Sequence, residues 1–274
     1  MRADQQPISA DSGVSTASIW RDRVSYVVGA ALAAITAIAW VEVVRQNMDM
    51  QPAITGDADV VSLPAAVVFL AAWGVMMAAM MLPSATPMIV MYDKISRGLA
   101  HGNRVVPTAF FAAIYLLIWL ALGAVVYIAG AGLNLLAAAN PNVASWLPYL
   151  LAAVLVATGV YQFTPLKRAC LRNCRTPVGF VMGRWRAGYR GTVKLAVAHA
   201  GYCVGCCVGL MVVLVAAGAM SLSWVLLIAA IVFIEKLLPR GELFARLAGV
   251  GFVVLGFAIA VDPDLAAMLR GAPM

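Results

Sequence analysis

Charged residues are scarce in this chain of 274 residues, in which Asp, Glu, Lys and Arg together make up 11%. Hydrophobic residues account for 64% of the sequence, and the mean hydropathy is +0.93. A chain of this composition would expose far too much apolar surface to be a soluble globular protein. The sequence therefore predicts a membrane protein.

Motifs of several functional classes are also missing. The sequence has neither a Gly-rich nucleotide-binding loop nor a phosphorylated-Asp motif, which excludes an ATP-driven pump from this chain alone. No catalytic constellation or organic cofactor motif stands out, so the sequence favours a protein that is not an enzyme. We expect residues 1–23 to form a disordered cytoplasmic tail, 24–262 a single transmembrane helical domain, and 263–274 a short C-terminal tail.

Seven apolar runs approach the length of about 20 residues that an α-helix needs to cross roughly 30 Å of hydrocarbon. The runs are Val24–Val44, Leu63–Leu82, Pro107–Gly130, Trp146–Phe163, Leu195–Met220, Leu222–Leu238 and Leu247–Val261. The last run has the weakest signal. The predicted fold is therefore an all-α, polytopic transmembrane helix bundle of about seven spans, or six.

Positive charges predict the orientation of the bundle, because cytoplasmic loops are enriched in Lys and Arg. With the N-terminus inside, every Lys and Arg except Arg45 and Arg270 falls on the cytoplasmic side, many of them in a basic loop at 164–194. The net charge of +7 is then explained by topology, and no nucleic-acid partner is required. We expect a multi-pass protein of the bacterial inner membrane, surrounded by the lipid bilayer, with its C-terminus outside.

The segment HAGYCVGCCVGLM places His199, Cys203, Cys206 and Cys207 inside an apolar run. At about 100° per residue, all four side chains project from one side of a helix. Four donors on one helix face cannot surround a zinc ion, which requires a closed tetrahedral site. Cu(I) with two or three ligands, completed from another helix, fits this geometry better. We therefore predict a metal site that prefers Cu(I), with zinc as the alternative.

Other interpretations of the cysteines remain open. The Cys-x-x-Cys spacing of Cys203 and Cys206 is shared with redox-active dithiols, and buried cysteines also serve as small hydrophobic residues. On another side of the same predicted helix, Gly201, Gly205 and Gly209 form a row of small residues. Such a row lets a neighbouring helix approach closely, so we expect it to be structural.

Methionines gather in a second predicted helix, WGVMMAAMMLPSATPMIVMY, around Pro83 and Pro87. They are Met76, Met77, Met80, Met81, Met88 and Met91. The neutral thioether suits Cu(I), although methionine also fills irregular gaps between helices. The prolines predict a kinked or partly unwound helix, which either lines a binding cavity or only improves packing. The first four methionines are the predicted partners of the cysteine helix, and the last two are candidate relay residues.

Three further residues are relay candidates on the cytoplasmic side. Cys170 and Cys174 lie four residues apart in the basic segment TPLKRACLRNCRTP, which suits either metal exchange or a plain juxtamembrane segment. Glu235 lies about 13 residues into the apolar run Leu222–Leu238, close to its cytoplasmic end and next to Lys236. An ionisable group there suggests a functional role, or an ion pair with a basic residue of the inner loops.

Four segments together resemble a bacterial family of unknown function whose members are described as predicted metal-binding integral membrane proteins. The segments are WGVMMAAMMLPSATPMIVMY, YQFTPLKRACLRNCRTP with the following WRAGYRG, HAGYCVGCC, and EKLLPRG. The resemblance extends from Trp73 to Gly241. It implies metal binding and strengthens the choice of His199 and the three neighbouring cysteines as ligands, but it specifies neither the ion nor an activity.

Three function classes follow. The first is Cu(I) binding within the bundle, for transport or for delivery, with a metallochaperone or a cuproprotein as partner. The second is a membrane thiol–disulfide redox protein that uses Cys203 and Cys206. The third is a structural or assembly subunit of a membrane complex. The methionines favour the first class, because thiol redox chemistry does not need thioethers. The sequence does not indicate an oligomeric state.

Overall fold

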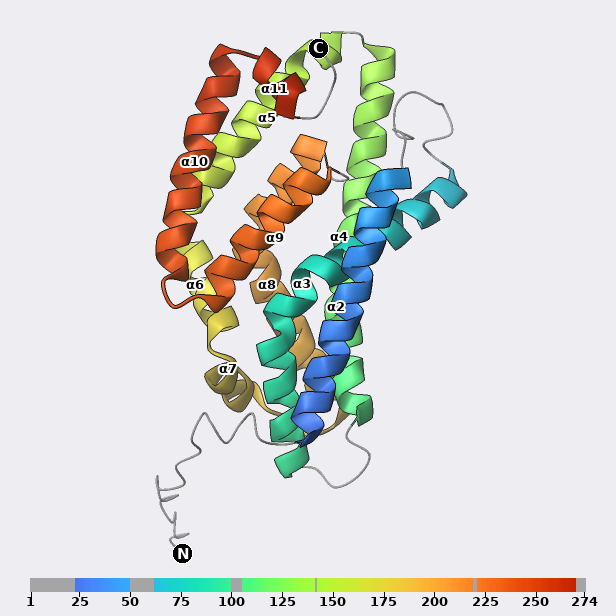
Figure 1. Ribbon diagram of the computed structural model, residues 1–274, viewed down its shortest axis with the longest axis vertical. Helices are drawn as coiled ribbons and strands as arrows, with labels where there is room; N and C mark the ends of the chain where they lie inside the picture. Colours follow the sequence, from blue (N-terminus) through green and yellow to red (C-terminus); the bar gives the residue numbers. More distant parts are fainter. Residues whose placement is uncertain (1–22, 50–61, 100–104, 141, 219–220, 270–274) are drawn as a thin grey trace, which may run out of the picture.

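The structure is a computed structural model that describes residues 23–49, 62–99, 105–140, 142–218 and 221–269. These residues form α-helices and contain no strand (Figure 1). The helices are α2 (Arg23–Asp49), α3 (Leu63–Leu99), α4 (Val105–Ala139), α5 (Asn142–Tyr161), α6 (Pro165–Arg175), α7 (Pro177–Arg184), α8 (Gly188–Gly218), α9 (Leu222–Leu237), α10 (Gly241–Val261) and α11 (Asp264–Leu269). The predicted all-α helix bundle is confirmed.

Five of the described helices are long and apolar enough to cross a membrane, namely α2, α3, α4, α8 and α10. A sixth span is added if α5 and α6, which meet at a bend of 66°, are counted together. The run at Leu222–Leu238 forms α9, whose 16 residues measure about 24 Å. It is shorter than the hydrocarbon layer of roughly 30 Å. The described residues thus provide five or six spans, fewer than the expected seven and equal at most to the alternative of six.

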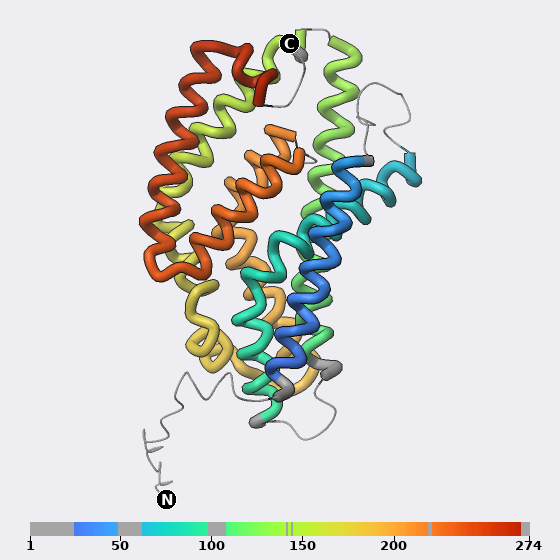
Figure 2. The backbone as a smooth tube through the Cα atoms, in the orientation of Figure 1, coloured from blue at the N-terminus to red at the C-terminus, as the bar shows by residue number. Residues whose placement is uncertain are grey.

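Helix α8 lies inside the bundle, where it packs against α4, α5, α6 and α9. Helix α3 packs against α2, α4, α7 and α9. Helix α3 carries the predicted methionines and is called the methionine helix, and α8 carries Cys203, Cys206 and Cys207 and is called the cysteine helix. Both α4 and α9 contact each of these two helices. The backbone trace shows how α9 runs through the middle of the bundle, with α10 and α5 on one side and α2 and α3 on the other (Figure 2).

Helix α3 continues through Pro83 and Pro87 without an interruption, and its axis turns part-way along its length (Figure 2). Each proline lacks a backbone donor and crowds the preceding turn, which explains a bend. Two hydroxyl groups bind backbone carbonyls in this region: Ser84 donates to Met81 O at 2.9 Å, and Thr86 donates to Leu82 O at 2.8 Å. The prolines predicted a helix that is either kinked or partly unwound, and the structure has the kinked helix.

The segment 164–194, expected as a basic cytoplasmic loop, contains α6 and α7 and the start of α8. Helix α6 begins after Thr164, whose side chain accepts a hydrogen bond from Lys167 N, with Pro165 in the first helical position. The predicted N-terminal tail falls almost entirely outside the described residues. The predicted C-terminal tail includes the short helix α11.

Glycines allow close helix contacts on one side of α8. A Cβ atom on Gly205 would lie 2.7 Å from Cys170 Sγ, and one on Gly209 would lie 3.0 Å from Thr158 Cγ2. No atom lies within 4 Å of the corresponding position on Gly201. The prediction of a close-packed glycine row is therefore confirmed for Gly205 and Gly209 and wrong for Gly201, which faces open space.

Candidate metal centre

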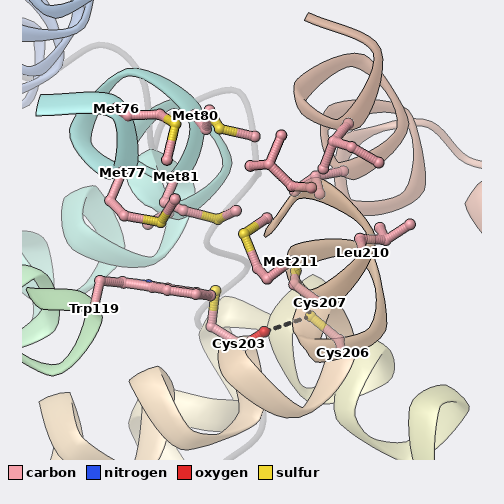
Figure 3. Packing of buried hydrophobic residues seen from close by; sticks show 14 of the residues in the cluster. Met76, Met77, Met80, Met81, Trp119, Cys203, Cys206, Cys207, Leu210 and Met211 are labelled. Atoms are coloured by element: carbon pink, nitrogen blue, oxygen red, sulfur yellow. Dashed lines mark hydrogen bonds between the residues drawn. The ribbon is translucent and has the colours of Figure 1, made fainter. Parts of the chain in front are cut away.

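Three cysteine thiols gather on the buried face of α8. The Sγ atoms of Cys203, Cys206 and Cys207 all lie within 4.8 Å of one another, and Cys206 Sγ is 3.4 Å from Cys207 Sγ. None of the three side chains is more than 1% exposed. In Figure 3 the three side chains lie on one turn of α8, where Cys206 Sγ donates to Cys203 O at 3.1 Å. The sulfur atoms are close enough to share one ion.

Cys203 connects this cluster to three other helices. Its Sγ lies 3.0 Å from the hydroxyl of Tyr115 on α4 and accepts a hydrogen bond of 2.8 Å from Lys236 Nζ on α9. The same ammonium group donates to Ser84 Oγ on α3 at 3.3 Å. Lys236 thus joins the cysteine helix to the methionine helix at the bend of α3.

The neighbouring Glu235 is engaged elsewhere. Its Oε2 forms an ion pair of 2.7 Å with Lys167 Nζ of α6, and its Oε1 accepts a hydrogen bond of 3.2 Å from Gln162. Both charged side chains of the pair are buried. Of the two interpretations of Glu235, the structure therefore has the ion pair with a basic residue of the 164–194 segment. A relay role for Glu235 stays a prediction.

Cys174 reaches the cluster from α6. Its Sγ lies 3.8 Å from Cys206 Sγ, and its side chain is half-buried. Cys170, one turn earlier, is buried against Gly205 of α8. Both cysteines were expected in an open basic loop, but they belong to a helix that packs directly on α8. The structure brings Cys174 to the predicted site, whereas Cys170 serves the contact between the two helices.

His199 lies one turn before Cys203 but does not join the group of donor atoms within 4.8 Å. Its ring stacks on Tyr115 and Phe111, and the edge of Phe180 completes the surroundings. Its two ring nitrogens are buried and have no hydrogen-bond partner among the described residues. Buried polar atoms without partners are uncommon, so this side chain is suited to receive a ligand. Its role as a metal ligand stays a prediction.

The predicted methionines are buried on α3. Met76, Met77, Met80 and Met81 are at most 3% exposed. Figure 3 shows them on the side of α3 that lies nearer α8, with Met211 of α8 pointing toward them. Met88 is also buried, and Met91 is half-buried. Lys236 of α9 contacts Ser84 of α3 and Cys203 of α8, so the two helices are linked indirectly. A shared metal site between the methionines and the cysteines stays a prediction.

The chemistry of this centre is that of a soft, largely apolar site. Three thiol groups lie together in a region without water access, and thioethers lie on the opposite helix. Thiolate and thioether ligands select Cu(I) and other soft ions, whereas structural zinc sites require four donors in a closed tetrahedron. Among the described Cys, His, Asp and Glu residues, three sulfur donors lie within 4.8 Å of one another, one fewer than a closed zinc site requires. This arrangement suits two- or three-coordinate Cu(I).

A family described as "PpoB2: Copper chaperone" matches residues 70–259, more than half of the chain. The chain belongs to this copper-chaperone family. The match runs from α3 to α10 and so includes the three cysteines, the methionines and Lys236. No curated protein and no solved structure matches the chain. The resemblance found in the sequence implied metal binding without naming the metal. Family membership supports a role related to copper.

Three residues of the site were not singled out from the sequence. Tyr115 gave no signal, because an aromatic residue in an apolar run is ordinary. Lys236 was noted only as the neighbour of Glu235. Met211 carried a signal that was overlooked: it follows Cys203 and Cys207 at intervals of four residues and so shares their helix face.

Proposed function

We propose that this chain binds Cu(I) at Cys203, Cys206 and Cys207 within the bundle and delivers it to a cuproprotein in the bacterial inner membrane or on its outer side. The observation that carries the proposal is the group of three buried thiols within 4.8 Å in a chain of a copper-chaperone family. Thiolates bind Cu(I) with low coordination numbers, as this one-sided cluster requires. Copper is here the cargo, and the cysteine cluster is its holding site.

The methionines are the second part of the proposal. Met76, Met77, Met80 and Met81 offer neutral thioethers next to the thiol cluster, with Met211 between the two groups in Figure 3. Thioethers bind Cu(I) without adding charge to a buried site, so they suit transient contact with an ion in transit. This arrangement favours passage of Cu(I) between α3 and α8.

Cys174 provides a third step. Its sulfur lies 3.8 Å from Cys206, so an ion bound by Cys206 reaches the Cys174 sulfur by ligand exchange over a short distance. Helix α6 belongs to the segment with the highest density of basic residues, which we assign to the cytoplasmic side. We therefore propose Cys174 as the link between the buried cluster and the cytoplasm, where a metallochaperone would dock.

The direct test uses the full chain in lipid nanodiscs and measures bound Cu(I) per protein under reducing conditions. The variant C203S/C206S/C207S is compared with C170S, because Cys170 is a buried cysteine that packs on α8 without joining the cluster. We expect copper binding in the wild type and in C170S and its loss in the triple variant. Equal copper binding by the wild type and the triple variant contradicts the proposal.

One observation favours a second function. The Cys174 and Cys206 sulfurs come from different helices and lie 3.8 Å apart, which suits a thiol pair that forms a disulfide by giving two electrons and two protons to a quinone or a partner disulfide, and is reduced again by a partner dithiol. This redox function predicts a reversible disulfide that links α6 to α8. Thiol trapping followed by mass spectrometry distinguishes the two functions, because a copper chaperone keeps all five cysteines reduced while it binds Cu(I).

A further inference from the structure

We infer that Lys236 determines the ion specificity of the cysteine cluster: its positive charge favours a monovalent ion such as Cu(I) over a divalent ion such as Zn(II). This inference rests on the proposed function, because it concerns the ion held by Cys203, Cys206 and Cys207. It assigns a role to a residue whose type is not a copper ligand.

Geometry places the ammonium group beside the cluster. Lys236 Nζ lies 2.8 Å from Cys203 Sγ, and its second contact is Ser84 Oγ at 3.3 Å. An ion that binds the Cys203 sulfur is therefore held close to a fixed positive charge. The side chain is only 7% exposed, so that solvent and salt screen this charge weakly.

Among the residues that the structure describes, no carboxylate forms an ion pair with Lys236. Glu235, the adjacent residue, pairs with Lys167. The other ion pairs found in the described part of the chain join Arg45 to Glu42 and Arg97 to Asp93, and neither includes Lys236. A buried charge needs a partner, and here the sulfur cluster is what the ammonium contacts. The field of Lys236 therefore acts on the metal site itself.

Two residues of α6, Lys167 and Arg175, hold the end of α9 that carries Lys236. The Lys167–Glu235 ion pair ties α6 to α9 one residue before Lys236. Arg175 Nη2 donates to Leu238 O at 2.6 Å and to Pro239 O at 2.9 Å, and so caps the end of α9. Lys236 thus belongs to a helix end that α6 holds in place, and its side chain is buried rather than free at the surface.

The selectivity follows from Coulomb's law. Repulsion between Lys236 and a bound cation is proportional to the charge of the ion, so it is twice as large for Zn(II) as for Cu(I) at the same position. This difference does not depend on how many of the three thiols bind the ion as thiolates. Removing the charge should therefore raise the affinity for Zn(II) more than the affinity for Cu(I).

The test measures Cu(I) and Zn(II) dissociation constants of the full chain in nanodiscs by competition with chromophoric chelators. Lys236→Met and Lys236→Gln both remove the charge, so that one variant can still be measured if the other fails to fold. Lys236→Arg keeps the charge. Lys194→Met is the matched control, because it removes a positive charge from an exposed position of α8.

We expect the preference for Cu(I) over Zn(II) to fall at least about tenfold in K236M and K236Q and to stay within about threefold of the wild type in K236R and K194M. An unchanged preference in both neutral variants overturns the inference, and so does a loss in K236R equal to that in K236M, which indicates a packing role. If the wild type binds no Cu(I), the proposed function fails instead.

Discussion

Cys203 is the residue at which four helices of this bundle meet through their side chains. Its sulfur contacts Tyr115 of α4 and Lys236 of α9, and Lys236 in turn contacts Ser84 of α3. The sequence indicated Cys203 and its neighbours, because four donors at helical spacing are visible along one chain segment. It did not indicate Lys236 as a partner, because helical periodicity describes the face of one helix and not the residue that a second helix places against it.

The Lys167–Glu235 pair gives a first prediction at this scale. Replacing Glu235 by Gln leaves the buried Lys167 ammonium without its counter-ion, and we expect a loss of about 3–5 kcal/mol in the free energy of unfolding. Thermal or denaturant unfolding of the purified protein measures this loss. The double variant K167M/E235L removes both charges and should recover most of the stability. Equal destabilisation by the single and double variants would show that packing, rather than the charge, is responsible.

The methionines give a second prediction. Leucine has nearly the volume of methionine but no sulfur, so Met76, Met77, Met80 and Met81→Leu together should preserve the fold within about 1.5 kcal/mol per position. We expect this variant to retain Cu(I) at the cysteines but to transfer it to a chelator more slowly, by at least about tenfold. Stopped-flow transfer measurements check this, with Met182→Leu, at an exposed position of α7, as a control. Unchanged transfer would mean that the methionines only pack.

Individual helices were predicted better than their contacts. The apolar runs correspond to described helices, and the prolines of α3 coincide with a helix whose axis turns. The segment at 164–194 was expected to be a loop, because its basic residues dominate its composition. In the structure most of these basic residues lie on the short helices α6 and α7 and on the first turns of α8, and α6 packs Cys170 and Leu171 inward. The composition showed that this segment is positively charged, but it did not show that α6 packs against α8.

Helix contact between α6 and α8 depends on Gly205, and this gives a prediction at the level of the element. In Gly205→Ala the added methyl group would meet Cys170 Sγ at about the 2.7 Å found for an ideal Cβ, so the Cys170 side chain or α6 itself must shift. We expect a loss of about 1–3 kcal/mol in stability and a slower cross-link between Cys174 and Cys206 under a mild oxidant.

Gly201→Ala is the control for this experiment, because nothing lies within 4 Å of its added methyl group. Alanine also has a higher helix propensity than glycine, so Gly201→Ala should be neutral or slightly stabilising. If both variants behave alike, the close approach of α6 to α8 does not matter for the position of Cys174.

The whole molecule is a bundle in which short helices, α6 and α9, complete a site on a membrane-spanning helix, α8. The number of spans could be predicted only approximately, because α9 is apolar like a span but too short to be one. The orientation rests on the distribution of Lys and Arg and stays a prediction.

Orientation is tested by labelling with a maleimide that does not cross membranes. Val178→Cys lies on α7, where the side chain is 47% exposed, and Trp146→Cys lies near the start of α5, where it is 68% exposed. With the N-terminus inside, Val178→Cys should react in inside-out vesicles and Trp146→Cys in right-side-out vesicles. The wild type supplies the background from the native cysteines. The reverse pattern would invert the topology and move Cys174 to the outer side.

The central claim is that thiolates of Cys203, Cys206 and Cys207 hold Cu(I) inside the bundle. X-ray absorption at the copper edge of the Cu(I)-loaded full chain tests it most directly, because the spectrum reports which atoms surround the ion. We predict a shell of two or three sulfur atoms that disappears in C203S/C206S/C207S. A shell dominated by nitrogen or oxygen, or an unchanged sulfur shell in the triple variant, would contradict the account.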